Sequence, residues 1–210
     1  MPRAQRVHIV DDDQAIREAL SWLFASRGLA TITYPSAEGF LQEYRNDADD
    51  AIDCLLLDIR MDGMSGLELQ DRLTTSSMAH LPIIFLTGHG NVPIAVRALR
   101  HGAVDVIEKP FNDNDLVDRV ICALNLESEL MQRRKQQRTA AECLARLTAR
   151  DGEVLDRMLQ GKYNKVIADE MGVSVRTVEV HRSAILRKMG VRTAVELAHR
   201  MAGLQRQSSH

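Results

Sequence analysis

The feature of this sequence that most constrains its fold is a short apolar run that recurs five times. The runs are "VHIV", "ATITY", "DCLLLD", "LPIIFLT" and "AVDVIEK", at residues 7–10, 30–34, 53–58, 81–87 and 103–109. Stretches of helical period lie between them, and such strand–helix alternation predicts a parallel α/β sheet with helices on both faces. The nearly all-apolar "CLLL" and "PIIFL" favour strands buried on both sides. This half has no Gly-rich phosphate loop.

The chain changes character after about residue 112. Residues 112–145 contain no Gly or Pro and are rich in helix formers, which predicts one long helix. Four shorter helical segments follow, separated by Gly161, Gly172 and Gly190. Residues 1–124 carry a net charge of −8 and residues 125–210 one of +6. We therefore expect a first domain over 1–124, a helical linker over 125–146 and a basic domain over 147–210 that contacts nucleic acid.

Cysteine usage and hydropathy exclude several classes of protein. Cys54, Cys122 and Cys143 are far apart and form no C-x-x-C pair, so we expect core residues in a reducing compartment rather than disulfides or zinc ligands. The N-terminus lacks the apolar segment of a signal peptide, and no window approaches the length of a membrane-spanning helix. These features predict a cytoplasmic protein with no membrane partner.

Polar side chains follow the predicted strands at the points where the strands end. Because ligands of open parallel sheets bind at the carboxyl ends of the strands, these side chains form a candidate site. Converging carboxylates would bind a hard cation such as Mg²⁺, and a carboxylate can act as a nucleophile toward phosphorus. A lysine would supply a cation for phosphoryl oxygens, and a threonine a hydroxyl donor. The residues are Asp11, Asp12 and Asp13, then Asp58, then Thr87, and finally Glu108, Lys109 and Pro110.

The segments "VDDD", "LLLDIRM", "LTG" and "EKPF" resemble the receiver domain of two-component response regulators, over residues 4–124. The resemblance implies a five-stranded flavodoxin-like sheet and phosphorylation on Asp58 by a sensor histidine kinase. It implies Mg²⁺ held by Asp11, Asp12, Asp58 and the backbone carbonyl of Arg60. It also implies Thr87 and Lys109 as a switch pair and a cis Lys109–Pro110 bond. Phosphorylation would reshape residues 91–107 and favour a homodimer.

The sequence departs from this family at two positions. Asp62 stands where family members usually have Pro, and it adds negative charge beside the metal loop. Val106 stands where they usually have Phe or Tyr, so no ring can turn inward to report phosphorylation. We therefore expect the change to travel through Thr87 and the loop "GHGN" at 88–91, whose two glycines permit backbone movement.

The basic half has the pattern of a helix-turn-helix. The spacing predicts one helix that buries Val166, Ile167 and Met171, a turn at Gly172, and a second helix capped by Ser174. The second helix is expected to bury Val175, Val178, Ile185 and Met189. Arg and Thr at the start of that helix suit entry into the DNA major groove.

Residues 147–201 resemble the LuxR-type helix-turn-helix of the FixJ/NarL response regulators. We expect phosphate contacts from Lys165, Arg176, Thr177, Arg182 and Lys188, which position the protein without reading sequence. The resemblance places Glu179, Val180 and Ser183 toward base edges. His181 is open to either a structural role or a DNA contact.

The sequence as a whole predicts a receiver domain followed by an all-α helix-turn-helix domain. We expect a DNA-binding response regulator, not an enzyme, whose partners are a sensor histidine kinase, promoter DNA, a second copy of the chain and RNA polymerase. The alternative is a haloacid-dehalogenase-type phosphatase, with Asp11 as nucleophile and Asp13 as acid/base. That reading leaves Asp58 and the C-terminal half unexplained. A vestigial receiver is disfavoured because every chemical group needed is present.

Overall fold

The computed structural model describes residues 3–45, 51–88 and 92–205, of which 203–205 are described by their backbone alone. They form two compact units, Met1–Met131 and Gln132–His210, and one long helix, α5, runs from the first into the second. The elements are β1 (Ala4–Val10), α1 (Gln14–Ser26), β2 (Ala30–Tyr34), α2 (Ala37–Glu43), β3 (Ala51–Asp58), α3 (Gly66–Thr74), β4 (Ile83–Thr87), α4 (Val92–Arg100), β5 (Asp105–Glu108), α5 (Asp113–Ala145), α6 (Ala149–Leu159), α7 (Asn164–Met171), α8 (Val175–Lys188) and α9 (Ala194–Gln205).

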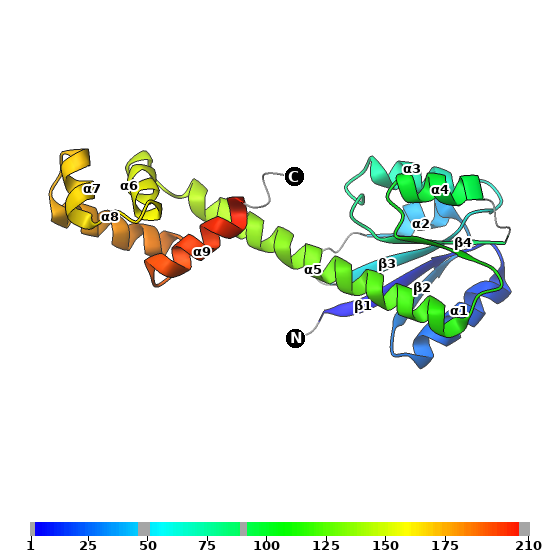
Figure 1. Cartoon of the computed structure of the whole chain (residues 1–210). Helices are drawn as coiled ribbons and strands as arrows, with labels where there is room; N and C mark the ends of the chain where they lie inside the picture. The colour runs from blue at the N-terminus through cyan, green and yellow to red at the C-terminus, as the bar shows by residue number, and fades with distance from the viewer. Residues whose placement is uncertain (1–2, 46–50, 89–91, 206–210) are drawn as a thin grey trace. The chain divides into compact units, whose positions relative to one another are not determined.

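The first unit is built on a five-stranded sheet whose strands are all parallel (Figure 1). The strand order is β2-β1-β3-β4-β5, so β1 and β3 lie side by side in the middle. The carboxyl ends of β1, β3, β4 and β5 therefore follow one another along one edge of the sheet. The expected flavodoxin-like α/β fold is confirmed, as is the all-helical second half.

Successive side chains along the strands point to opposite faces of the sheet and pack into two separate cores. On one face, Phe24 of α1 and Leu116 of α5 pack against strand residues such as Leu56. On the other face, α2, α3 and α4 cover a second core that includes Leu57 and Phe85. The complete burial of β3 explains its nearly continuous apolar sequence.

All four short helices of the second unit and the C-terminal end of α5 contribute side chains to its hydrophobic core. Gly172 ends α7 with a positive φ of 64°, which the turn requires and which a side chain would resist. The expected burial is confirmed for Ile167, Val178, Ile185 and Met189, and Met171 is partly buried. It is wrong for Val166 and Val175, which are exposed.

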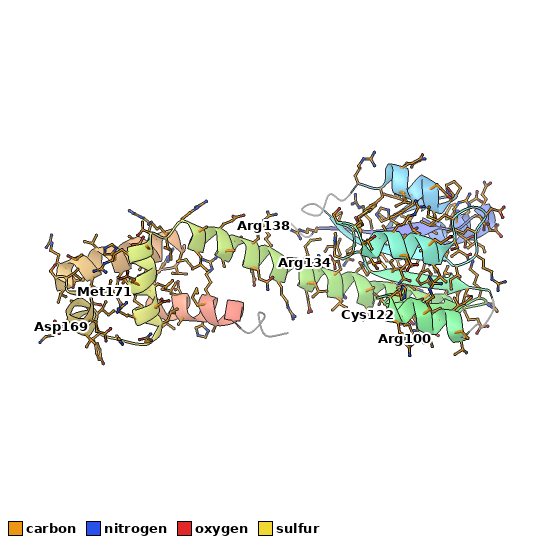
Figure 2. All side chains as sticks on the ribbon, turned by 90° about the horizontal axis from the view of Figure 1, so that it is seen from above. Arg100, Cys122, Arg134, Arg138, Asp169 and Met171 are labelled. Atoms are coloured by element: carbon orange, nitrogen blue, oxygen red, sulfur yellow. The ribbon has the colours of Figure 1, made fainter. Side chains whose placement is uncertain are left out.

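The cysteines are free in this structure, but they are not all core residues. Cys54 is buried and Cys143 partly buried, whereas Cys122 is exposed on α5 (Figure 2). The expectation of a core residue is therefore wrong for Cys122. None of the helices described is both long and apolar enough to cross a lipid bilayer.

Candidate functional site

The centre of the site is a lysine bonded to two carboxylates from neighbouring strand ends. Lys109 Nζ donates to Asp58 Oδ1 at 2.6 Å and to Asp11 Oδ2 at 2.8 Å. Asp58 is the last residue of β3, Asp11 follows β1, and both carboxylates are buried. The parallel sheet thus brings together three groups that are far apart in sequence, since Lys109 is 51 residues from Asp58 and 98 from Asp11.

Burial and neighbouring charges shift the pKa values of Asp58 and Lys109. Burial raises the pKa of Asp58 above its ordinary value and the Asp11 carboxylate adds to the rise, although the bond from Lys109 opposes it. Burial alone would lower the pKa of Lys109, but hydrogen bonds to Asp11 and Asp58 raise it overall. Lys109 therefore keeps its positive charge beside a carboxylate whose proton affinity is raised.

The three consecutive aspartates have three different environments. Asp11 Oδ1 accepts from the backbone N–H of Asp13 at 2.9 Å, in addition to its bond from Lys109. Asp13 caps α1, accepting from Ala15 N at 2.8 Å. Asp12 is exposed, and its Oδ2 accepts from the backbone N–H of Asp62 at 3.1 Å. A proline at position 62 could not donate that bond, so this departure from the family pattern has a structural role.

The remaining predicted residues lie at the same edge. Thr87 ends β4, and its carbonyl accepts from Lys109 N at 2.7 Å. Asp58 Oδ2 accepts from the backbone N–H of Arg60 at 2.7 Å, which holds the carboxylate toward the loop after β3. The Lys109–Pro110 bond is cis, as expected. Residues 89–91 of the loop at 88–91 lie outside the described residues. The expected role of this loop in transmitting the change on phosphorylation therefore stays a prediction.

The donor atoms at this edge suit a hard cation. The side chains of Asp11, Asp12 and Asp58 and the Arg60 carbonyl offer oxygen alone, which is the chemistry that Mg²⁺ prefers. Within the part of the chain that is described, no three His, Cys, Asp or Glu side chains are grouped as a metal site. The reason lies in the contacts above, because Asp12 binds the Asp62 backbone while Lys109 lies between the other two carboxylates.

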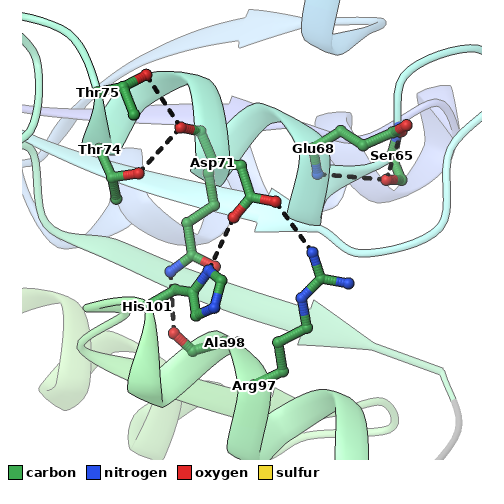
Figure 3. Close-up of polar contacts among 9 residues, drawn as sticks. Ser65, Glu68, Asp71, Thr74, Thr75, Arg97, Ala98 and His101 are labelled. Carbon is green, nitrogen blue, oxygen red and sulfur yellow. Dashed lines mark hydrogen bonds and ion pairs between the residues drawn. The ribbon is translucent and has the colours of Figure 1, made fainter.

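The face expected to change on phosphorylation includes α4, which is tied to α3 by polar contacts (Figure 3). Asp71 of α3 accepts from Arg97 at 3.0 Å and pairs with His101 Nδ1 at 2.8 Å. The buried Gln70 donates to the carbonyl of Ala98 at 2.9 Å. Four apolar side chains of α4 and of the segment between α4 and β5 are exposed, namely Val92, Val96, Leu99 and Val104.

The second helix of the helix-turn-helix, α8, presents one side to an open groove of about 630 Å³. The groove is lined by Arg176, Glu179, Val180, Ser183, Ala184 and Arg187. Four of these were expected to face DNA. The sequence argument gave no DNA role to Ala184 or Arg187, although each follows an expected residue by four positions and so shares its helix face.

The other expected DNA residues lie around this groove. Lys165 is exposed on α7, whereas Thr177 and Arg182 are partly buried on α8. Lys188 is bonded to Asp151 within the domain, a contact that the sequence argument did not predict.

Comparison with known protein families agrees with both halves of this description. Residues 7–121 match the response regulator receiver domain, and residues 145–201 match the bacterial regulatory proteins of the luxR family. The C4-dicarboxylate transport transcriptional regulatory protein DctR of Rhodobacter capsulatus is 46% identical over 193 residues, which cover 91% of this chain and 96% of the relative. The transcriptional regulatory protein FixJ of Azorhizobium caulinodans is 40% identical over 204 residues, covering 96% and 93%.

Among solved structures, the response regulator StyR matches with a TM-score of 0.86 at 39% identity, covering 95% of this chain and 98% of that one. Receiver domains of this kind typically use Mg²⁺ for phosphorylation, and they imply a sensor kinase as partner. The helix-turn-helix implies binding to DNA. The chain therefore belongs to the two-component response regulators that join a receiver domain to a LuxR-type DNA-binding domain, and it is a transcriptional regulator rather than an enzyme.

Proposed function

We propose that this regulator is switched by phosphorylation of Asp58. The observation that carries the proposal is the bond of Lys109 to both Asp58 and Asp11. A carboxylate oxygen of Asp58 attacks phosphorus, and the bond from phosphorus to the donor group breaks. The donor leaves as an imidazole from a sensor histidine kinase or as a carboxylate from an acyl phosphate. The Lys109 ammonium is then within reach of the new phosphoryl oxygens.

Asp11, Asp12, Asp58 and the backbone carbonyl of Arg60 would hold Mg²⁺ beside the reacting group. When bound, the ion offsets repulsion between the carboxylates and the incoming phosphate. The chain itself contributes orientation, because the Arg60 N–H and Lys109 each hold one oxygen of Asp58. Thr87, at the end of the next strand, supplies a hydroxyl for the same phosphoryl group.

In this proposal the receiver covers residues 1–124, a helical linker 125–146 and the DNA-binding domain 147–210 of a cytoplasmic regulator. Phosphorylation draws Thr87 and Lys109 toward Asp58, acts through the loop at 88–91 and reshapes the surface of α4 and β5. The exposed apolar side chains along α4 support a second copy as the partner of that surface. A two-fold dimer would bind two DNA half-sites near a promoter and act there on RNA polymerase.

Labelling with a small acyl phosphate followed by mapping of the modified residue tests the proposal. Asp58→Asn should abolish labelling and leave the fold intact, and removal of Mg²⁺ with a chelator should also stop it. If Asp58→Asn still labels while Asp11→Asn does not, the nucleophile is Asp11 and the phosphatase-type chemistry replaces ours.

A further inference from the structure

The recognition helix α8 has two adjacent basic residues at its C-terminal end, and the structure uses them differently. Arg187 is exposed and lines the groove. Among the described residues, its guanidinium makes no hydrogen bond or ion pair. Lys188, the next residue, points along another side of the helix, where its Nζ lies 2.6 Å from Asp151 Oδ2. A rotation of about 100° around α8 therefore separates a cation available to a ligand from a cation used inside the domain.

Asp151 is a buried carboxylate that joins α6 to two turns of α8. Its Oδ1 pairs with His181 Nδ1 at 2.8 Å and its Oδ2 with Lys188, seven residues further along the same helix. It also forms a capping box with Thr148 at the start of α6. Burial would raise the pKa of Asp151, but the bonds from Lys188 and His181 lower it well below its usual range. The Asp151 carboxylate is therefore anionic, and the bonds from Lys188 and His181 stabilise its charge.

Withdrawing Lys188 from Asp151 is costly. Asp151 is 2% exposed, so loss of Lys188 would leave a buried anion whose remaining partners are His181 and the backbone and side chain of Thr148. Breaking a buried pair from one side is strongly unfavourable, because the remaining charge is neither solvated nor compensated. Arg187 is not held in an ion pair of this kind among the described residues, and its guanidinium can bind a phosphate with two parallel hydrogen bonds.

We propose that Arg187 is a DNA-phosphate contact at the C-terminal end of the recognition helix. Lys188, expected from the sequence to make that contact, is instead a positioning residue that acts with His181 through Asp151. The three residues Asp151, His181 and Lys188 fix the rotation of α8 about its axis, which aims the groove face at the DNA. The inference rests on the proposed use of α8 for DNA binding and adds to it which charges are neutralised there.

The salt dependence of DNA binding separates the two roles. Each phosphate contact adds about 0.9 to the slope of log K against log salt concentration, because binding releases a condensed counterion. The full chain, kept with acetyl phosphate and Mg²⁺, is titrated against a duplex selected by that chain from a randomised pool. Arg187→Gln should lower the slope by about 0.9. Lys188→Gln should leave the slope unchanged and reduce affinity by the same factor at every salt concentration.

A second measurement follows the positioning role directly. Lys188→Gln should lower the thermal midpoint of the DNA-binding domain. Adding Asp151→Asn should restore part of the lost stability, because the buried Asp151 carboxylate, then without its lysine, is removed. If Lys188→Gln does not fold, the slope of log K against log salt concentration is measured on the double variant with Lys188→Gln and Asp151→Asn. Arg187→Gln should leave that midpoint unchanged.

The outcomes distinguish this inference from the function on which it rests. If the wild-type chain shows no salt-dependent binding, the proposed DNA interface fails, and this assignment fails with it. If the wild type binds but Lys188→Gln lowers the slope while Arg187→Gln does not, the assignment alone is overturned. A loss of slope in Arg187→Gln together with partial rescue of Lys188→Gln by Asp151→Asn supports it.

Discussion

Gly66, the first residue of α3, should not tolerate even a methyl group. A Cβ built there lies 2.2 Å from the carbonyl oxygen of Asp58 and 3.1 Å from Cγ of Leu57. A carbon–oxygen contact needs about 3.3 Å, so α3 and the end of β3 must separate by roughly 1 Å. Neither can give easily, because Asp58 belongs to a central strand and the Gly66 N–H donates to the carbonyl of Ile59 at 3.1 Å.

Gly66→Ala should therefore destabilise the receiver by about 1–3.5 kcal/mol. Overpacking of this kind costs about 1–3 kcal/mol and a strained or lost hydrogen bond adds about 1, while the reduced entropy of the unfolded chain returns about 0.5–1. Because the displaced carbonyl belongs to Asp58, labelling by acyl phosphate should also slow.

Gly39→Ala is a matched control in the same unit. Gly39 also lies in the first turn of a helix after a serine cap, but the nearest atom to its added Cβ is Ser36 Oγ at 3.5 Å, an ordinary contact. This variant should be more stable than wild type by about 0.4–1 kcal/mol. Urea unfolding followed by circular dichroism measures both variants. A Gly66→Ala protein with wild-type stability and labelling rate would refute the claim that α3 is packed against the backbone of Asp58.

Two further perturbations test other parts of the receiver. Although burial raises it, bonds from His8 and Arg6 lower the pKa of Asp53 to about 2, so its stabilising effect should be present above about pH 4 and lost as the pH falls toward 2. Acid titration of stability should show a loss of about 2 kcal/mol over that window, and Asp53→Asn should lack it. Val106→Phe restores a ring at the usual switch position, and sedimentation with and without acetyl phosphate compares it with wild type. Wild type should dimerise on phosphorylation, and dimerisation restricted to the Val106→Phe variant would exclude the route through the loop at 88–91.

The architecture and the acidic edge could be predicted from the sequence because both follow from periodicity and strand direction. Once the apolar runs are assigned to parallel strands, the residues after them must gather at one edge. The sequence argument placed Asp11, Asp58 and Lys109 at this edge, whereas the hydrogen bonds that Lys109 makes to both carboxylates come from the structure. The cis bond at Pro110 came from the family resemblance instead.

The errors occurred where a contact depends on the packing of separate elements. Periodicity gives the apolar side of a helix but not how far the neighbouring helices extend over it, which is why Val166 and Val175 at the starts of α7 and α8 are exposed. Similarly, Lys188 and Asp151 are 37 residues apart, and nothing local indicates that they pair.

One combination of side chains joins elements at three places among the residues that the structure describes, and its strength should differ among them. An aspartate contacts a histidine and an arginine or lysine: Asp53 with His8 and Arg6, Asp71 with His101 and Arg97, and Asp151 with His181 and Lys188. The first joins two central strands and the third joins α6 to α8, and in both the carboxylate is buried.

The second joins α3 to α4, and there the Asp71 side chain is 41% exposed. Solvent and salt reduce an exposed pair to about 0–1 kcal/mol, whereas a buried carboxylate that loses a partner costs several times more. The contact of Asp71 with His101 and Arg97 can therefore be broken at little cost in free energy. It holds α4, the helix whose surface changes in our proposal. The two strong ties hold the sheet beneath Asp58 and the recognition helix, which are the parts that must keep their geometry in both states of the switch.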